Sequence, residues 1–339
     1  MKNSIIVILL LCTLTPVFGQ SWNLVWSDEF NYLGLPDNTK WVHEVGLIRN
    51  QELQYYTNKR LENCKVVNGS LLIIGKKELY KGSDYTSACI TTEKKYNFKY
   101  GKVEARIKLP RGQGMWPAFW MLGQNISQVG WPQCGEVDIM EQINDEGKNH
   151  GTMHWDNNGH KKYGSTVPCD VQQYHVYSIE WTENAIKWFL DGTKFWEGNI
   201  KDSINSTGEF HKPFYLMLNL AIGGSWPGSP DATTLFPDTM SVDYVRVYQQ
   251  KTTHTISSIP SSKPVQLSPN PKTDILTFTM PQLYRDGDLK IVDIKGAESI
   301  NRHIDDAVTQ LTVGHLSKRI YFLTCRKDIQ SVPQKYIKS

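Results

Sequence analysis

Three acidic residues lie close together in the segment 135–141, whose sequence is GEVDIME. Alternate residues of a β-strand share a face, so Glu136 and Asp138 would point to one side while the apolar residues between them face a core. Glu141 has the opposite parity. A β-bulge, most simply at Met140, adds one residue and would return Glu141 to the acidic face. The spacing therefore predicts a bulged strand that carries three carboxyls on one face of a concave sheet.

Carboxyls crowded in this way repel one another, which raises the pKa of at least one of them. Glu136 and Glu141 could then hydrolyse a glycosidic bond, one glutamate acting ionised as nucleophile and the other protonated as acid. Hydrolysis with retention requires the two carboxyls to lie about 5–5.5 Å apart. Two other interpretations stay open: the acids could form the solvated face of an amphipathic strand, or they could bind a hard cation such as calcium.

Aromatic residues surround the acidic segment in the sequence. Indole rings stack on the apolar faces of sugars, although many Trp side chains are simply buried in cores. Trp131 and Trp226 adjoin Gly and Pro in expected loops, so they are the best candidate sugar platforms. The other aromatic candidates lie in the segments 116–120 and 154–155.

Most of the first 248 residues have a β pattern. Short runs rich in β-branched and aromatic residues are separated by turn residues, and Asn68-Gly69 and Asp191-Gly192 are typical hairpin dipeptides. The pattern predicts an all-β chain with a two-sheet antiparallel sandwich. Strands are expected within residues 70–74, 101–109, 174–181, 186–190, 194–196 and 241–248.

The two ends of the chain have other characters. Residues 1–19 combine Lys2, an apolar run and a small-residue exit, which is typical of a signal peptide; a buried helix or a lipid anchor at Cys12 are the alternatives. Residues 249–263 lack a core pattern and predict a linker, and residues 264–339 predict a second, smaller β unit. The other five cysteines match no zinc-ligand spacing and leave any disulfide pairing open.

The charges of the chain nearly balance, with 37 Lys and Arg residues against 34 Asp and Glu residues and a net charge of +3. This balance provides no strongly basic field for a polyanion, so we expect no nucleic-acid partner. We expect the chain to act as a monomer.

The segment 135–141, together with WPAFW at residues 116–120, resembles glycoside hydrolase family sixteen, and most of all its laminarinase-type endo-β-1,3-glucanases. The resemblance covers about residues 22–248. It implies a concanavalin-like β-jelly-roll sandwich with a concave substrate cleft. Further motifs that carry it are ELQYYT at 52–57, FKYGKVEAR at 98–106, GTMHW at 151–155, NLAIGGSWPG at 219–228 and DYVRVY at 243–248.

The resemblance also implies roles for matching residues. Glu136 would be the nucleophile, Glu141 the acid/base, and Asp138 would orient the nucleophile. Catalysis would need no cofactor. The implied sugar contacts are Trp116, Trp120 and Trp131 in the donor subsites, His154 beside the acid/base on the leaving-group side, and Asn50, Glu52, Trp155 and Trp226. For His154 a purely structural role is the alternative.

Two further features follow from the resemblance. A structural calcium on the convex face would map onto Glu29, Gly69 and Asp243. Cys89 stands where relatives usually have an arginine, which puts one contact of the cleft in doubt.

Residues 264–339 resemble the C-terminal sorting domain of the type IX secretion system of Bacteroidetes, which implies a small β-sandwich and export to the medium or the cell surface. A carbohydrate-binding module is the alternative, but the segment contains no Trp. The chain is therefore predicted to be a secreted endo-β-1,3-glucanase that cleaves laminarin-like glucans with retention, its partners being β-glucan and the secretion machinery. A family member acting on mixed-linkage glucan or a red-algal galactan, and a non-catalytic glucan-recognition protein, are the alternatives.

Overall fold

The computed structural model describes residues 22–250, 266–270, 274–279, 287–293, 297–304, 308–317, 320–327 and 330–337. The chain divides into two compact units, Met1–Lys251 and Thr252–Ser339. The predicted signal peptide lies outside the described residues, and so does the predicted linker apart from Gln249 and Gln250. These two residues end a strand and pair with its neighbour, so regular structure extends two residues into the predicted linker.

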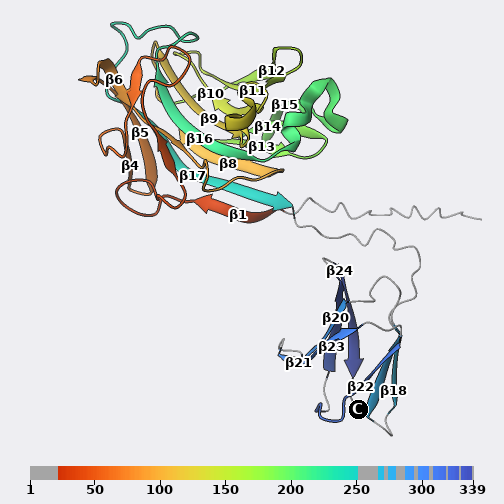
Figure 1. The fold of residues 1–339 in the computed structure, drawn as a ribbon. Helices are drawn as coiled ribbons and strands as arrows, with labels where there is room; N and C mark the ends of the chain where they lie inside the picture. The colour runs from red at the N-terminus through yellow and green to blue at the C-terminus, as the bar shows by residue number, and fades with distance from the viewer. Residues whose placement is uncertain are drawn as a thin grey trace, which may run out of the picture. The chain divides into compact units, whose positions relative to one another are not determined.

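The first unit is a sandwich of two β-sheets, which confirms the predicted all-β fold (Figure 1). Its larger sheet has the order β15-β14-β13-β8-β17-β5-β6-β3, with β1 beside β17 and β4 beside β5. The strands are β1 (Trp22–Asp28), β3 (Gln54–Tyr56), β4 (Cys64–Val67), β5 (Ser70–Tyr80), β6 (Ser83–Ser87), β8 (Gly101–Lys108), β13 (His175–Trp181), β14 (Ala185–Leu190), β15 (Thr193–Asn199) and β17 (Asp238–Gln250).

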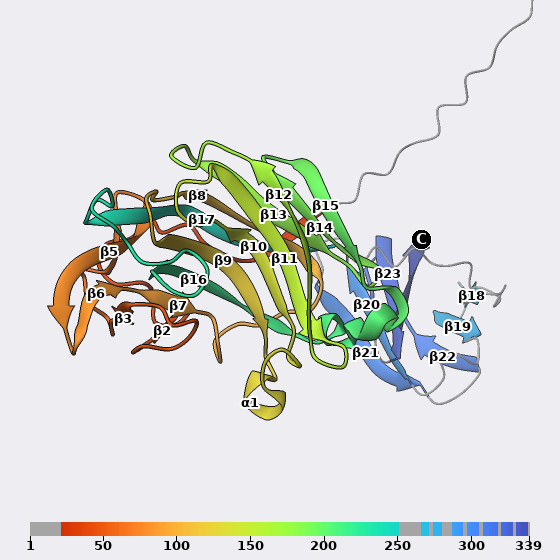
Figure 2. The same cartoon turned by 90° about the horizontal axis from the view of Figure 1, so that it is seen from above.

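The second sheet is curved and has the order β12-β11-β10-β9-β16-β7-β2 (Figure 2). Its strands are β2 (Val42–Glu44), β7 (Cys89–Thr91), β9 (Met115–Gly123), β10 (Glu136–Glu141), β11 (Lys148–Asp156), β12 (His160–Pro168) and β16 (Phe214–Ile222). Two short helical segments accompany the sheets, α1 (Ile126–Val129) and the irregular 3₁₀ segment Lys201–His211. Among the described residues, no helix has the length and hydropathy of a membrane span.

Strand β16 shows how the sequence builds this sheet. Leu216, Leu218 and Leu220 enter the main core between the two sheets, whereas Tyr215 and Met217 join a smaller apolar cluster on the opposite face. Neighbouring residues of a strand point to opposite faces, so an uninterrupted apolar run is the pattern of a strand covered on both sides. The apolar cluster beside Tyr215 and Met217 forms part of the floor on which the site stands.

The predicted bulge is present in β10. Asp138 pairs with Trp120 of β9, but Met140 already pairs with Phe119, so the register shifts between Asp138 and Met140. Ile139 and Met140 both enter the main core, and Glu141 returns to the face of Asp138. The bulge is therefore confirmed, and the additional residue opposite β9 is Ile139 rather than Met140.

Both predicted hairpins are confirmed. Asp191-Gly192 connects β14 to β15, and Asn68-Gly69 connects β4 to β5. Asp191 and Gly192 have φ angles of 48° and 78°, which is the conformation that a tight two-residue hairpin turn requires.

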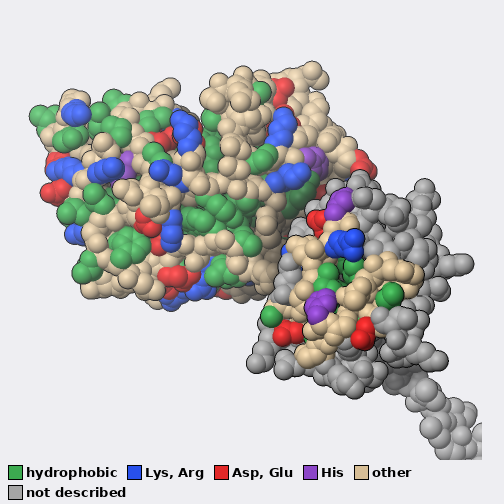
Figure 3. All heavy atoms as spheres, turned by 60° about the horizontal axis from the view of Figure 1, so that its bottom comes forward, with side chains coloured by type: hydrophobic (Ala, Val, Ile, Leu, Met, Phe, Trp, Pro, Cys, Tyr) green, Lys and Arg blue, Asp and Glu red, His purple; other side chains and the backbone are tan. Residues whose placement is uncertain are grey.

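The cysteines with described side chains in the first unit are all free thiols: Cys64, Cys89, Cys134 and Cys169. On the face of the molecule drawn in Figure 3, acidic and basic side chains are interspersed, in keeping with the balanced composition.

The second unit contains two small antiparallel sheets, which agrees with the predicted β-sandwich. The first sheet has the order β18-β19-β22 and the second has the order β21-β20-β23-β24. The strands are β18 (Gln266–Asn270), β19 (Ile275–Thr279), β20 (Gly287–Asp293), β21 (Glu298–Ile304), β22 (Val308–Thr312), β23 (Ile320–Lys327) and β24 (Gln330–Ile337).

Candidate active site

The strand register places the acidic residues in rows across the curved sheet. Glu136 pairs with His154 of β11 and Leu122 of β9, and Asp138 pairs with Thr152 and Trp120. A third row runs across six strands, and its members are His150, Glu141, Ala118, Asn219, Cys89 and Glu44. Residues far apart in the sequence therefore share one face because of the order of the strands.

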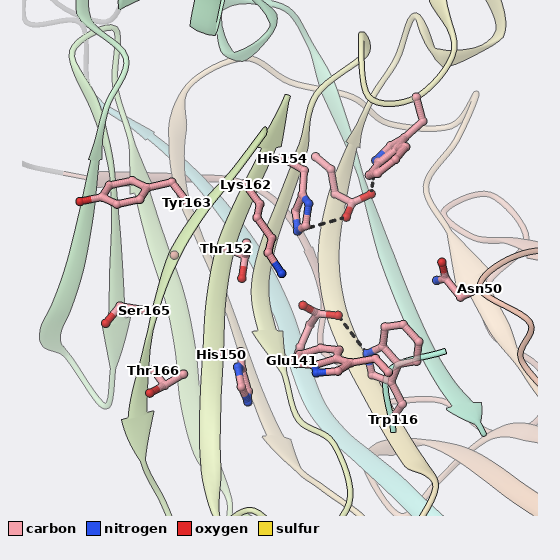
Figure 4. Close-up of a pocket in the computed structure, with 14 residues that line it drawn as sticks. Asn50, Trp116, Glu141, His150, Thr152, His154, Lys162, Tyr163, Ser165 and Thr166 are labelled. Atoms are coloured by element: carbon pink, nitrogen blue, oxygen red, sulfur yellow. Dashed lines mark hydrogen bonds and ion pairs between the residues drawn. The ribbon is translucent and has the colours of Figure 1, made fainter. Parts of the chain in front are cut away.

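Glu136 is held by two ring systems. The indole Nε1 of Trp131 donates a hydrogen bond to Glu136 Oε2 at 3.0 Å, and His154 Nε2 lies 3.9 Å from Oε1 (Figure 4). The same His154 nitrogen is 3.2 Å from Asp138 Oδ2. His154 therefore stands between two carboxylates. Its other ring nitrogen, Nδ1, is hydrogen-bonded to Nε2 of His160 at 2.8 Å.

Glu141 has a different set of neighbours. Trp116 Nε1 donates to Glu141 Oε1 at 2.9 Å, and the ring of Trp226 packs edge-on against Trp116. Trp226 in turn packs against the ring of His150. Lys162 of β12 lines the same part of the surface and faces the cleft together with Glu141 (Figure 4).

Burial raises the pKa of Glu136, Asp138 and Glu141 above the usual values of carboxyls. The Asp138 carboxyl adds to the rise of the pKa of both glutamates, while the N–H groups of Trp131 and Trp116 oppose it. Asp138 is 2% exposed and Glu141 9% exposed. The cluster thus retains protons at pH values at which a free carboxyl is ionised, which a general acid requires. The repulsion expected from the sequence contributes, but burial is the larger cause.

A tryptophan from the opposite sheet supports the bulge from beneath. Trp188 of β14 is fully buried, and its Nε1 donates to the backbone carbonyl of Asp138 at 2.7 Å. A bulge interrupts the ladder of backbone hydrogen bonds, and a buried carbonyl needs another donor there. Trp188 provides that donor and so fixes the backbone of β10 at the bulge between Asp138 and Glu141.

Two hollows meet at the glutamates. The hairpin hollow, of about 570 Å³, extends over β11 and β12, and the loop hollow, of about 510 Å³, extends over β9, β16 and the loop that follows β2. Both are lined by Asn50, Trp116, Trp131, Glu136 and Glu141. The carboxyls therefore stand in the middle of a continuous surface depression that extends to both sides of them.

Most predicted sugar contacts line this depression. Trp226 and His154 line the hairpin hollow, and Trp120 and Glu52 line the loop hollow. Glu52 is buried and accepts hydrogen bonds from Gln54 and Asn50. Trp120 is also mostly buried and donates to Asn219 Oδ1 at 2.7 Å.

The prediction for Trp155 was wrong. Trp155 follows His154 on β11, so its side chain points to the opposite face of the sheet. It enters the main core, packs against Phe210 and donates to the carbonyl of Asn205. Strand parity excludes that His154 and Trp155 both face the cleft.

The residues predicted for a structural calcium are engaged elsewhere. The Glu29 carboxylate accepts two hydrogen bonds from Arg246, at 2.9 and 2.7 Å, and Asp243 accepts one from Arg106 at 2.7 Å. Gly69 occupies the turn between β4 and β5. An arginine therefore pairs with each carboxylate as the side chains are placed, and calcium binding stays a prediction.

One other group has the composition of a metal site. Ligand atoms of Glu136, Asp138 and His154 lie within 4.8 Å of one another, the one such group found among the described residues. Two of these residues belong to the acidic cluster itself, and His154 is the histidine that stands between them.

Sequence reasoning missed several residues of the depression. His150 shares its strand face with His154, so parity alone would have placed it there. Lys162 stands on β12, which pairs with β11 throughout its length. Arg49 lines the loop hollow, but no sequence pattern distinguishes it from an ordinary surface arginine.

Comparisons with known proteins agree with this geometry. A sequence profile of "Glycosyl hydrolases family 16" matches residues 46–267. A β-glucanase from Rhodothermus marinus is 43% identical over 250 residues, which cover 67% of this chain and 85% of that protein. The chain belongs to glycosyl hydrolase family 16.

Solved structures of family 16 share the fold of the first unit. The catalytic domain of a laminarinase from Thermotoga petrophila superposes with a TM-score of 0.61 at 43% identity, covering 69% of this chain and all of that one. The laminarinase from Rhodothermus marinus gives a TM-score of 0.65 at 40% identity, covering 68% of this chain and 98% of that one. Residues 266–339 match a profile of the "Secretion system C-terminal sorting domain".

Proposed function

We propose that this family 16 protein is a secreted endo-β-1,3-glucanase that cleaves internal bonds of laminarin-like glucans with retention, and that Glu136 and Glu141 perform the chemistry. One observation carries the proposal: two glutamates from one bulged strand stand in the middle of a depression that continues on both sides. A cleft that accepts chain on both sides of the carboxyls suits attack within a polymer.

In the first step, the ionised Glu136 carboxylate attacks the anomeric carbon of the glucosyl unit on its donor side. Glu141 donates its proton to the glycosidic oxygen, the bond to the leaving chain breaks, and a glycosyl ester on Glu136 forms. In the second step, Glu141 takes a proton from water, and the resulting hydroxide attacks the ester carbon. Glu136 is released as a carboxylate, and two inversions leave the configuration retained.

The neighbours of each glutamate fit these roles. Trp131 donates its indole N–H to Glu136, and this hydrogen bond and the charge of His154 both lower the pKa of Glu136 and so favour its ionised form. Glu141 is buried and keeps its proton until the leaving oxygen takes it. Asp138 lies between the two glutamates on β10, and the contact of its carboxylate with His154 orients the ring beside the nucleophile.

The substrate assignment rests on relatives. The glucan endo-1,3-β-glucosidase of Cryptopygus antarcticus is 35% identical over 251 residues, and a variant of LamA from Zobellia galactanivorans, 39% identical, was solved with laminaritriose and laminaritetraose. More distant relatives include a keratan-sulfate endo-1,4-β-galactosidase and an endo-1,3-1,4-β-glycanase, at 33% and 32% identity. Mixed-linkage glucan and galactans are therefore the substrates to test against laminarin.

The test measures reducing sugar released by the mature chain, residues 20–339, from laminarin, mixed-linkage glucan, agarose and carrageenan. The Glu136→Ala variant serves as the blank. We expect rapid release of short oligosaccharides from laminarin. Preferential cleavage of another polymer would contradict the substrate, and binding of laminarin without turnover would contradict the enzymatic function.

The C-terminal unit serves export. A sorting domain of this kind directs the chain to the type IX secretion system, and so to the medium or the cell surface. Removing residues 264–339 is expected to block export and leave glucan hydrolysis unchanged, whereas loss of glucan affinity would indicate a binding module. The monomeric state is a prediction that light scattering of the purified chain would test.

A further inference from the structure

The loop hollow contains an arginine in an unusual position. Arg49 lies in the loop between β2 and β3, and its guanidinium stands over the indole face of Trp120, 5.3 Å from the ring centroid. A guanidinium stacks favourably on an indole, and its planar fork of donors suits pairs of oxygen atoms. Arg49 therefore covers the aromatic floor where a sugar would otherwise contact Trp120 directly.

A small row of residues holds this guanidinium in place. Arg49 Nη2 donates to Glu44 Oε2, and the Cys89 thiol lies 3.0 Å from the same oxygen. Cys89 stands between Asn219 and Glu44 in the row across β16, β7 and β2, and it is fully buried. A thiol is much smaller than a guanidinium, so the cysteine leaves space on this face of the sheet that the loop residue Arg49 occupies.

The guanidinium is not saturated by the protein. Arg49 Nη1 is buried and has no hydrogen-bond partner among the described residues, although about a fifth of the side chain, 21%, remains exposed. A buried donor without a partner is costly, and a hydroxyl placed beside it recovers that cost. Glu44 and Glu93 line the same hollow, so the surroundings of Arg49 favour a neutral ligand over an anionic one.

We infer that Arg49 is a specificity-determining contact of the loop hollow. Its guanidinium, which occupies the space that Cys89 leaves open, binds hydroxyl groups of a donor-side glucosyl unit remote from the cleaved bond. This inference rests on the proposed function. It also bears on Cys89, which stands where relatives usually have an arginine: in this chain Arg49 brings a guanidinium to the cleft instead.

The experiment varies donor length at a constant leaving group. 4-Nitrophenyl glycosides with two, three and four β-1,3-linked glucosyl units are given to the wild-type chain and to Arg49→Ala. We expect kcat/KM to fall by roughly 10–100-fold for donors long enough to reach Arg49, the loss expected for a hydrogen bond to a charged group. For the shortest donor we expect a change below about threefold, within the scatter of a substitution that touches no bound sugar.

Three further variants separate a contact from a structural role. Arg49→Lys should stay impaired on long donors, because an ammonium lacks the planar fork. In Arg49→Ala/Cys89→Arg, a guanidinium enters the same space from β7, and we expect at least partial recovery on long donors. Arg111→Ala removes an exposed arginine that pairs with Asp145 outside both hollows, and should show no dependence on donor length.

The inference is overturned if Arg49→Ala loses the same factor on every donor, or loses nothing on the longest one. Recovery by Cys89→Arg distinguishes a sugar contact from a fold defect, and thermal melting of each variant checks that the fold is intact. A wild-type chain that cleaves none of the β-1,3-linked glycosides would contradict the proposed function instead.

Discussion

The loop hollow and the hairpin hollow differ in how they are built. The loop hollow is lined by side chains from β2, β9, β16 and a loop, and hydrogen bonds fix several of them. Trp120 donates to Asn219, and Asn219 donates in turn to Tyr56. The hairpin hollow is formed largely by β11 and the edge strand β12, and its lining is polar and more exposed.

We assign the loop hollow to the donor side, because Trp116, Trp120 and Trp131, which the family resemblance places in donor subsites, all line it. With this assignment, the difference matches the order of events in double displacement. The donor chain stays attached to Glu136 between the two steps, whereas the leaving chain departs after the first and is replaced by water. A prearranged donor side holds the intermediate in position, because its side chains lose little freedom on binding. A polar, open acceptor side allows the leaving chain to exchange with water. Each prediction below would break or sharpen this contrast between the two hollows.

The largest effects are expected at the two glutamates. Glu136→Ala and Glu141→Ala should each lower kcat on laminarin by about 10³-fold or more, because each removes a step of the reaction. With a dinitrophenyl glycoside, which needs no proton on its leaving group, Glu141→Ala should keep a rapid first step and Glu136→Ala should not. Stopped-flow release of the phenol measures this. Equal losses on the activated substrate would contradict the separate roles.

Trp131 and Trp226 compare a residue shared by both hollows with a residue of the hairpin hollow alone. Trp131 lines both hollows and bonds to Glu136, so Trp131→Ala should lower kcat/KM by roughly 10–100-fold, as expected when a sugar platform and a hydrogen bond are both lost. Trp226 lines the hairpin hollow, so Trp226→Ala should act through KM, by about 3–10-fold, and for long acceptors only. Steady-state kinetics on defined oligosaccharides measure both effects. A larger loss of kcat/KM in Trp226→Ala than in Trp131→Ala would contradict the difference between the two hollows.

Glu141→Gln should stabilise the protein at high pH. Burial raises the pKa of Glu141 from 4.5 to about 8, so the folded state holds a proton that the unfolded state has released. The stability that Glu141 contributes is therefore present below pH 4.5 and is lost as the pH rises towards 8.

Gln is neutral at every pH and removes this loss. We expect the variant to melt about 4–8 °C higher than wild type at pH 8, which corresponds to on the order of 2 kcal/mol. Below pH 4.5 the two proteins should melt alike. Calorimetry at both pH values measures the difference, and an equal shift at both would show that Glu141 is not held protonated.

The smallest effect is expected at Lys162. Burial raises the pKa of Glu141, and the Lys162 ammonium opposes that rise. Lys162→Gln should therefore move the alkaline limb of kcat/KM to higher pH by about 0.3–0.5 units, as expected for one exposed charge screened by water. Lys161→Gln is the matched control, because its side chain belongs to the opposite strand face. A shift towards lower pH, or the same shift in both variants, would contradict the role of Lys162.

Local features of the fold could be predicted from the sequence. The bulge followed from the parity of Glu136, Asp138 and Glu141, and the hairpins followed from Asp191-Gly192 and Asn68-Gly69. These features depend on residues that are neighbours in the chain. The same parity, had it been applied to β11, would have kept Trp155 out of the cleft and brought His150 in.

The loop hollow could not be predicted in this way. Glu44, Cys89 and Asn219 are neighbours because β2, β7 and β16 lie side by side, and no pattern within any one strand specifies that order. The position of Arg49 depends further on the space beside Cys89. Non-local strand order and side-chain volume decide this part of the site, and both require the structure.

The identity of the nucleophile is tested most directly by trapping the glycosyl ester. A 2-deoxy-2-fluoro laminaribiosyl fluoride slows both steps but the second more, so the intermediate accumulates and mass spectrometry locates the attached sugar. The account predicts one added disaccharide per chain, attached to Glu136, and none on Glu136→Ala. A sugar attached to Glu141 or Asp138, or turnover of the fluoride with no adduct on any residue, would contradict it.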